Sequence, residues 1–256
     1  MSSLKLLDDI RKGSKWYRDK EYGEKDVFPS SCERCLEIQK WLEFLNQNCQ
    51  YNKFKPRLQG THKQRDKTLA EVKASYFISE ILGYKIAQWE PKGNNGKTLE
   101  FSFKVDKGIE IFCEVKSPGW ERAEVEKKDF NRINEQKYKE KCEVKYYDNK
   151  MDIILSIQKA SQQFKEEEIN MLIIVDDLWV SNKVDRYHGI KCALFNGKDG
   201  CFTNSNFIKL SAIANLNIDV MDRKIVYTWK VFRNPNAKIE LPKNFDKENY
   251  IYEVHI

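Results

Sequence analysis

The segment from Thr98 to Lys116 constrains the fold more than any other part of the chain. Its two halves, "TLEFSFKV" and "IEIFCEVK", alternate apolar and polar residues, which is typical of strands with one buried face. The intervening "DKG" suits a three-residue hairpin loop with Gly108 in the left-handed conformation. Val105 then pairs with Ile109, and this register predicts one continuous apolar face. The residues of that face are Leu99, Phe101, Phe103, Ile111, Cys113 and Val115.

The same register predicts an unusual pairing on the other face of the hairpin. Glu100 lies directly opposite Glu114, and Lys116 is the next residue along that face. Like charges placed directly opposite each other are destabilising, so a positive group is expected between them. Two carboxylates and a lysine form a candidate site for a hard divalent cation with a reactive water nearby. The alternative is a solvent-exposed face that carries ordinary surface charges.

Before this hairpin the sequence predicts two helices and a short strand. Ser30 and Glu33 have capping-box spacing, so a helix is expected to follow "PSSCER". The basic stretch Lys53–Lys67 contains Pro56 and Gly60 and is interpreted as a linker or an exposed arm. A second helix is expected at about 67–82, followed by Gly83 as its C-cap. The strand "YKIAQWE" then leads into the hairpin.

After the hairpin, the residues from Ser117 to about Lys150 are densely charged and indicate an inserted segment. A helix is expected at about 151–165, followed by "NMLIIVDDLWV", which is apolar enough for a fully buried central strand. The remainder indicates further strands and loops with one short helix. The alternation of helices and strands predicts an α/β or α+β protein with a mixed sheet.

This pattern resembles the PD-(D/E)XK nuclease superfamily, whose core is a helix, three antiparallel strands, a helix and a further strand. In that superfamily an acid lies on the second strand and Glu-x-Lys on the third. Here "EVK", Glu114 to Lys116, matches the Glu-x-Lys position, and Glu100 matches the first acid. Glu71 matches a further acid on the preceding helix. One departure is that Leu99-Glu100 replaces the usual Pro-Asp.

The resemblance implies a restriction-endonuclease-like core, in which a central mixed β-sheet is flanked by helices. It further implies a helical and basic N-terminal extension over residues 1–66 and a nuclease domain over residues 67–256. The function implied is that of a metal-dependent endonuclease that hydrolyses the phosphodiester bonds of nucleic acid, DNA more than RNA. The alternative is a catalytically degenerate module that keeps the fold and binds nucleic acid or protein. A coincidental Glu-x-Lys in an unrelated α/β protein is a third reading.

The resemblance also implies roles for individual residues. Glu100, Glu114 and the backbone carbonyl of Val115 would bind Mg²⁺ or Mn²⁺. Lys116 would orient or deprotonate the attacking water, or neutralise the scissile phosphate. Glu71 would reach the metal directly or through water. In the helix expected at about 151–165, Gln158, Gln162 and Gln163 are weaker candidates for contacts to the site or to phosphate, and a solvated helix face is the alternative.

Two further sets of residues are candidates for binding. Structural zinc could be held by four residues, although cysteines that line a helix face are the alternative; the four are Cys32, Cys35, Cys49 and His62. Phosphate contacts could come from the stretch Lys53–Lys67 and from the charged insertion, with a solvated linker as the alternative. Base stacking could come from aromatics, with packing in the core or on the surface as the alternative. The residues concerned in the insertion and among the aromatics are Lys127, Lys128, Arg132, Trp16, Tyr17 and Trp120.

Composition sets the remaining limits. The 256 residues are 41% hydrophobic and 12% aromatic, which is enough for a substantial core. No apolar run approaches the ~20 residues of a membrane helix, and the charged N-terminus lacks the apolar segment of a signal peptide. Seven cysteines without a repeated spacing do not indicate a disulfide framework. We therefore expect a cytoplasmic protein whose net charge of +6 mildly favours polyanionic partners; a homodimer is an open option.

Overall fold

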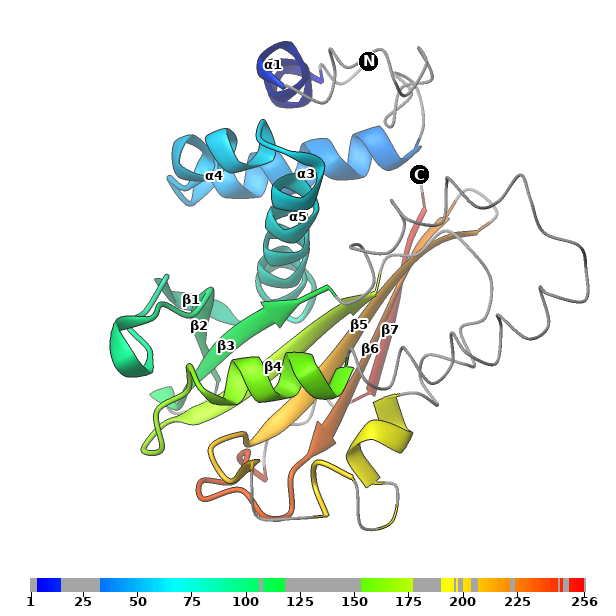
Figure 1. The fold of residues 1–256 in the computed structure, drawn as a ribbon. Coiled ribbons are helices and arrows are strands. Elements are labelled where there is room, and N and C mark those ends of the chain that lie inside the picture. Colours follow the sequence, from blue (N-terminus) through cyan, green and yellow to red (C-terminus); the bar gives the residue numbers. More distant parts are fainter. Residues whose placement is uncertain are drawn as a thin grey trace, which may run out of the picture.

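A computed structural model describes residues 4–14, 33–105, 108–117, 153–176, 190–195, 197, 200–203, 207–221, 224–243, 245 and 249–255 (Figure 1). In this part of the chain a seven-stranded sheet is flanked by helices. The strands are β1 (Lys85–Trp89), β2 (Phe101–Lys104), β3 (Glu110–Lys116), β4 (Ile169–Asp176), β5 (Ala212–Met221), β6 (Lys224–Arg233) and β7 (Asn249–His255). The helices are α1 (Lys5–Gly13), α3 (Glu33–Gln47), α4 (Tyr51–Leu58) and α5 (His62–Tyr76), with η2 (Phe77–Ile81), η3 (Asn94–Gly96) and further helical segments at 153–161 and 190–195.

The order of the strands across the sheet is their order along the chain, β1 to β7. β1, β2 and β3 are antiparallel, β3, β4 and β5 are parallel, and β5, β6 and β7 are antiparallel again. Parallel neighbours need crossover connections. The helix at 153–161 lies in the first crossover and the helix at 190–195 in the second. The predicted mixed sheet is confirmed, and so is the central position of the apolar strand, β4.

The predicted hairpin register is confirmed at every pair that the sheet contains. Phe101 pairs with Cys113, Ser102 with Phe112, Phe103 with Ile111 and Lys104 with Glu110. Gly108 has φ +79°, the left-handed conformation expected for the end of the hairpin loop.

Leu99 was expected on the apolar face that contains Phe101, and this expectation is wrong. Leu99 is buried, but it packs in the cluster on the opposite side of the sheet. Its N–H donates to the carbonyl of Pro91 at 3.0 Å, and β2 begins only at Phe101, after a bend at Glu100. The bend changes the alternation, because residues two apart share a face only along a continuous strand.

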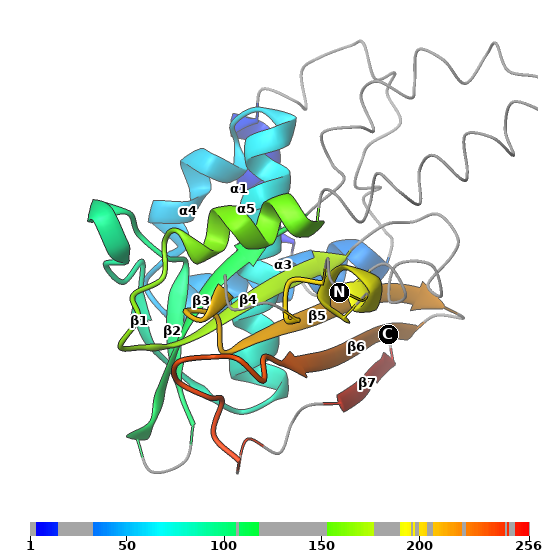
Figure 2. The ribbon, with the colours of Figure 1, turned by 60° about the horizontal axis from the view of Figure 1, so that its bottom comes forward.

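The helices cover the two faces of the sheet separately (Figures 1 and 2). On one side, α1, α3, α4, α5 and η2 pack against a large apolar cluster that includes Trp41, Phe77 and Trp229. On the other side, the helix at 153–161 lies over β3 and β4 and buries Ile157 against Leu172. β3 and β4 are therefore covered on both faces, as expected for parallel strands.

The interpretation of Lys53–Lys67 as a linker or an exposed arm is wrong, because α4 and α5 occupy most of this stretch. Tyr51, Phe54 and Leu58 recur at helical spacing and are buried against the neighbouring helices. Thr61 ends the connection between the two helices, and its Oγ1 accepts a hydrogen bond from the N–H of Gln64 at 3.3 Å. The predicted domain division after residue 66 falls within α5.

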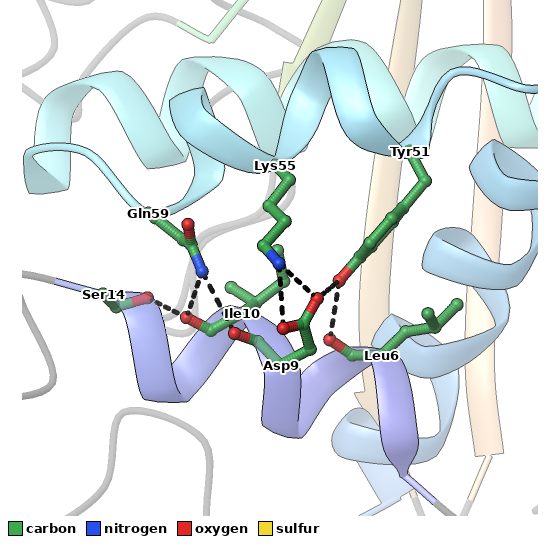
Figure 3. Close-up of polar contacts among 7 residues, drawn as sticks. All are labelled: Leu6, Asp9, Ile10, Ser14, Tyr51, Lys55 and Gln59. Atoms are coloured by element: carbon green, nitrogen blue, oxygen red, sulfur yellow. Dashed lines mark hydrogen bonds and ion pairs between the residues drawn. The ribbon is translucent and has the colours of Figure 1, made fainter.

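The sequence did not predict α1. Hydrogen bonds and an ion pair join it to α4 (Figure 3). Asp9 accepts hydrogen bonds from Lys55 Nζ at 2.7 and 2.8 Å and from the Tyr51 hydroxyl at 2.7 Å. The bond from Lys55 lowers the pKa of Asp9, and burial raises the pKa of Tyr51. Gln59 Nε2 donates to the carbonyls of Asp9 and Ile10 near the C-terminal end of α1. These contacts fix the position of α4 relative to α1.

Within the described ranges, no helix combines the length and the hydropathy that a membrane span requires.

Candidate active site

Glu100 and Glu114 form a carboxyl pair at the edge of the hairpin. The N–H of Glu100 donates to the carbonyl of Cys113 at 3.1 Å, although Cys113 already pairs with Phe101 in the ladder. The ladder therefore ends at Phe101–Cys113, and Glu100 lies at a bend beyond it, with its carboxyl group beside that of Glu114. Burial raises the pKa of Glu100 well above its ordinary value, and a hydrogen bond with Glu114 and the charge of Glu114 raise the pKa further. The pKa of Glu100 is therefore raised because two carboxyl groups lie together in an enclosed place, where ionising both is costly.

One oxygen of Glu114 is saturated and the other is not. Oε1 accepts hydrogen bonds from Lys116 Nζ and, at 2.6 Å, from Gln163 Nε2. Burial favours loss of the Lys116 proton, but the charges of Glu114 and Glu100 outweigh it, so the pKa of Lys116 is raised. Oε2 of Glu114 and Oε2 of Glu100 are both enclosed, and neither has a hydrogen-bond partner among the residues that the structure describes. Two buried acceptor oxygens therefore lie unsatisfied in neighbouring side chains.

These oxygens match the chemistry of a hard divalent cation. Mg²⁺ prefers oxygen ligands, retains several waters and needs only one or two protein carboxylates. The carbonyl of Val115 points to the same side of β3 as that of Cys113, because alternate carbonyls of a strand face the same neighbour. There the N–H of Leu99 is already bonded to Pro91. Among the residues that the structure describes, no group of three or more His, Cys, Asp or Glu residues converges as a metal cluster.

Glu71 lies close to the pair but has a different partner. Glu71 is 8% exposed and lies on α5, and Ser75, one helical turn further along α5, is also buried. Both of its carboxylate oxygens accept hydrogen bonds from Arg57 Nη2 on α4. Burial raises the pKa of Glu71, Arg57 opposes the shift, and the charges of Glu114 and Glu90 add to it. The charge of Glu114 therefore acts on Glu71, but the hydrogen-bond partner of Glu71 is Arg57 of α4.

Of the three candidate glutamines, Gln163 reaches the site, whereas Gln158 and Gln162 are exposed. The backbone carbonyl of Gln163 accepts a hydrogen bond from the N–H of Asn94 at 2.6 Å. The connection between β1 and β2 is thereby joined to the residue that binds Glu114. A Cβ at Gly93 would approach this carbonyl oxygen to 2.5 Å, so only glycine fits there without a shift.

Gly93→Ala is therefore expected to destabilise the protein by about 1–3 kcal/mol, the usual effect of forcing atoms into a packed site. The φ of Gly93 is −86°, which alanine adopts without strain, so the effect isolates the steric contact. Thermal denaturation followed by circular dichroism measures it, with Lys92→Ala in the same loop as the control. Equal midpoints for the two variants would show that Gln163 moves away without loss.

The four proposed zinc ligands do not form one site. Cys35 lies in the first turn of α3 and Cys49 two residues beyond its last residue, Gln47, so the helix separates them by roughly 20 Å at 1.5 Å per residue. Cys35 is buried in the core, where its sulfur accepts a hydrogen bond from Arg11 Nη2, and Cys49 is exposed. Several other candidates lie outside the described residues, namely Cys32, Trp16, Tyr17, Trp120, Lys127, Lys128 and Arg132.

Comparisons with known proteins add little to this geometry. No family model matches the chain, and no curated protein matches it. Among solved structures, SfsA of Pyrococcus furiosus in complex with Ca²⁺ is similar at 15% identity and a TM-score of 0.25. The alignment covers 63% of this chain and 60% of the SfsA chain. At that TM-score the similarity is not evidence for a shared fold or function. What the structure defines is a mixed α/β protein with a buried acid pair beside a lysine.

Proposed function

We propose that the protein is a Mg²⁺- or Mn²⁺-dependent nuclease that hydrolyses phosphodiester bonds. One observation carries the proposal: the Oε2 atoms of Glu100 and Glu114 are enclosed, have no partner among the described residues, and belong to a carboxyl pair beside Lys116. Buried polar atoms are normally hydrogen-bonded, and each exception needs an explanation. A divalent cation that binds both oxygens supplies one.

The order of the elements supports a PD-(D/E)XK type of core. α5, β1, β2, β3, the helix at 153–161 and β4 follow one another as helix, three antiparallel strands, helix and strand. Glu114 and Lys116 are on the third of these strands, and Glu100 immediately precedes the second. Glutamate in place of aspartate at position 100 adds one methylene to the side chain. Glu100 lies at the bend that precedes β2, so the longer side chain starts from a backbone that differs from a regular strand.

The residues of this chain would divide the reaction among them. Glu100, Glu114 and the carbonyl of Val115 would hold the cation, which, when bound, stabilises charge on the phosphate and acidifies a water. Lys116, whose side chain is 29% exposed, would orient the attacking water or neutralise the scissile phosphate. Gln163 would keep Glu114 Oε1 engaged, so that Oε2 faces the cation. Catalysis would thus rest mainly on positioning and electrostatics.

The test is cleavage of a panel of single- and double-stranded DNA and RNA by the purified protein with Mg²⁺ or Mn²⁺. DNA is the substrate class expected to react, and EDTA is expected to stop the reaction. Glu114→Ala and Lys116→Ala, purified in parallel, exclude a contaminating nuclease. A wild-type protein that cleaves nothing in either metal would leave a catalytically inactive binding module as the better description.

A further inference from the structure

The three glutamates near the site differ in the hydrogen-bond partners of their carboxylate oxygens. Glu100 and Glu114 each have an enclosed oxygen that no group in the described part of the chain contacts by a hydrogen bond, whereas Arg57 binds both oxygens of Glu71, the second at 2.5 Å. The side chain of Glu71 is 10% exposed and that of Arg57 is 31% exposed, so the pair is largely shielded from water. A guanidinium is always charged in proteins, so it neutralises Glu71 permanently.

Arg57 is held in this position from several sides. Its Nη1 lies 3.8 Å from Glu90 Oε1, and its guanidinium lies 5.2 Å from the centre of the Phe54 ring. Glu90 has φ +50° and its N–H donates to the carbonyl of Glu100 at 2.9 Å, so Arg57 also contacts the residue next to the acid pair. The Arg57 side chain therefore lies between α5 and the loop that supports Glu100.

α4 itself is fixed by the contacts between α1 and α4 described above (Figure 3). Lys55 and Gln59, two residues before and after Arg57, bind Asp9 and the end of α1. The guanidinium thus enters the site from a helix that is anchored elsewhere, and it does not depend on Glu71 alone for its position.

From these contacts we propose that Arg57 takes the place of a second metal ion. The site binds one divalent cation, through Glu100 and Glu114, and the guanidinium supplies the second positive charge at Glu71. Glu71 is then a counter-ion to Arg57 and not a metal ligand. Arg57 is a positioning residue that fixes the number of ions. This inference rests on the proposed function, because it assumes that the acid pair binds a cation.

The number of bound Mn²⁺ ions tests the inference without any substrate. Titration of the full chain, followed by the electron paramagnetic resonance of free Mn²⁺, is expected to show one ion for the wild type. Arg57→Gln exposes the carboxylate of Glu71 and is expected to bind a second ion. The double variant Arg57→Gln/Glu71→Gln is expected to return to one. Lys5→Gln removes a positive charge from an exposed position on α1, away from Glu71, and is expected to stay at one.

Glu71→Gln gives a second, independent measurement if Arg57→Gln does not fold. Loss of a metal ligand weakens binding by far more than tenfold, whereas the proposal expects a change of less than about tenfold and one ion still bound. Two ions on the wild type, one ion on Arg57→Gln, or loss of binding in Glu71→Gln would each overturn the inference while leaving the proposed function standing. A wild-type protein that binds no Mn²⁺ would overturn both.

Discussion

Glu100→Gln is expected to have two opposite effects: it stabilises the metal-free protein and removes metal binding. The glutamine amide can donate to the enclosed Oε2 of Glu114, and the variant no longer places two ionisable carboxyl groups side by side. One unit of pKa corresponds to about 1.4 kcal/mol, and 1 kcal/mol shifts the midpoint of a chain of this size by about 2–4 °C. We therefore expect the thermal midpoint at pH 8 in EDTA to rise, by about 3–6 °C for each unit by which the pKa of Glu100 is raised in the folded protein.

The pH dependence of stability identifies the cause of this rise. The pKa of Glu100 is raised in the folded protein, so its contribution to stability is fully present below its ordinary pKa of 4.5 and is lost as the pH rises through the folded-state pKa. The midpoint of the metal-free wild type should therefore fall, relative to Glu100→Gln, as the pH increases from 4.5. Glu253→Gln, the same change at an exposed position on β7, should follow the wild type. Parallel curves for the wild type and Glu100→Gln would show that Glu100 titrates normally.

The same variant should lose cation binding. Changes to groups that merely support metal ligands weaken affinity by about 10–100-fold, so loss of a charged ligand oxygen should weaken Mn²⁺ binding by at least about 100-fold. Calorimetric titration measures this, again with Glu253→Gln as the control. A variant that is more stable without metal and no longer stabilised by Mn²⁺ is the combined signature of an acid pair kept for a cation. Unchanged affinity would remove Glu100 from the proposed ligands.

Lys116→Ala is expected to reduce the cleavage rate by about 10²–10⁴-fold, the usual contribution of a positioned proton-transfer or charge-stabilising group. The ammonium of Lys116 contacts Glu114, and its removal leaves the acid pair more negative. Mn²⁺ affinity should therefore stay the same or increase while the rate falls. Single-turnover cleavage together with the Mn²⁺ titration separates the two effects.

Two further variants make the Lys116 experiment specific. Lys116→Arg should not restore the rate, because a planar guanidinium does not replace a compact ammonium in a partly buried position. Lys104→Ala changes an exposed lysine on β2 and should cleave like the wild type. Wild-type rates in Lys116→Ala would exclude Lys116 from the chemistry, and loss of Mn²⁺ binding would instead indicate a structural role.

The hairpin and its acid pair were predictable because they depend on local rules. A three-residue loop fixes the register as far as Phe101–Cys113, and this brings Glu100, the next residue, near Glu114. Contacts between residues distant in the chain escaped prediction. Arg57 was interpreted as part of a linker, because Pro56 and Gly60 resemble loop residues, although the spacing of Tyr51, Phe54 and Leu58 indicates a helix. Its partnership with Glu71 depends on how α4 packs on α5, which no local pattern specifies.

The strand order of the sheet, which equals the order of synthesis, has a consequence for how the protein is made. Each strand pairs with one that has already left the ribosome, so the sheet can grow from β1 towards β7 without waiting for a distant partner. The carboxyl pair is complete once β3 has emerged, before β4 and its crossover exist. We therefore expect a nascent chain to expose the carboxyl groups of Glu100 and Glu114 early and to enclose them only when Gln163 has been synthesised. Translation pauses or chaperones would then matter most while the first crossover forms.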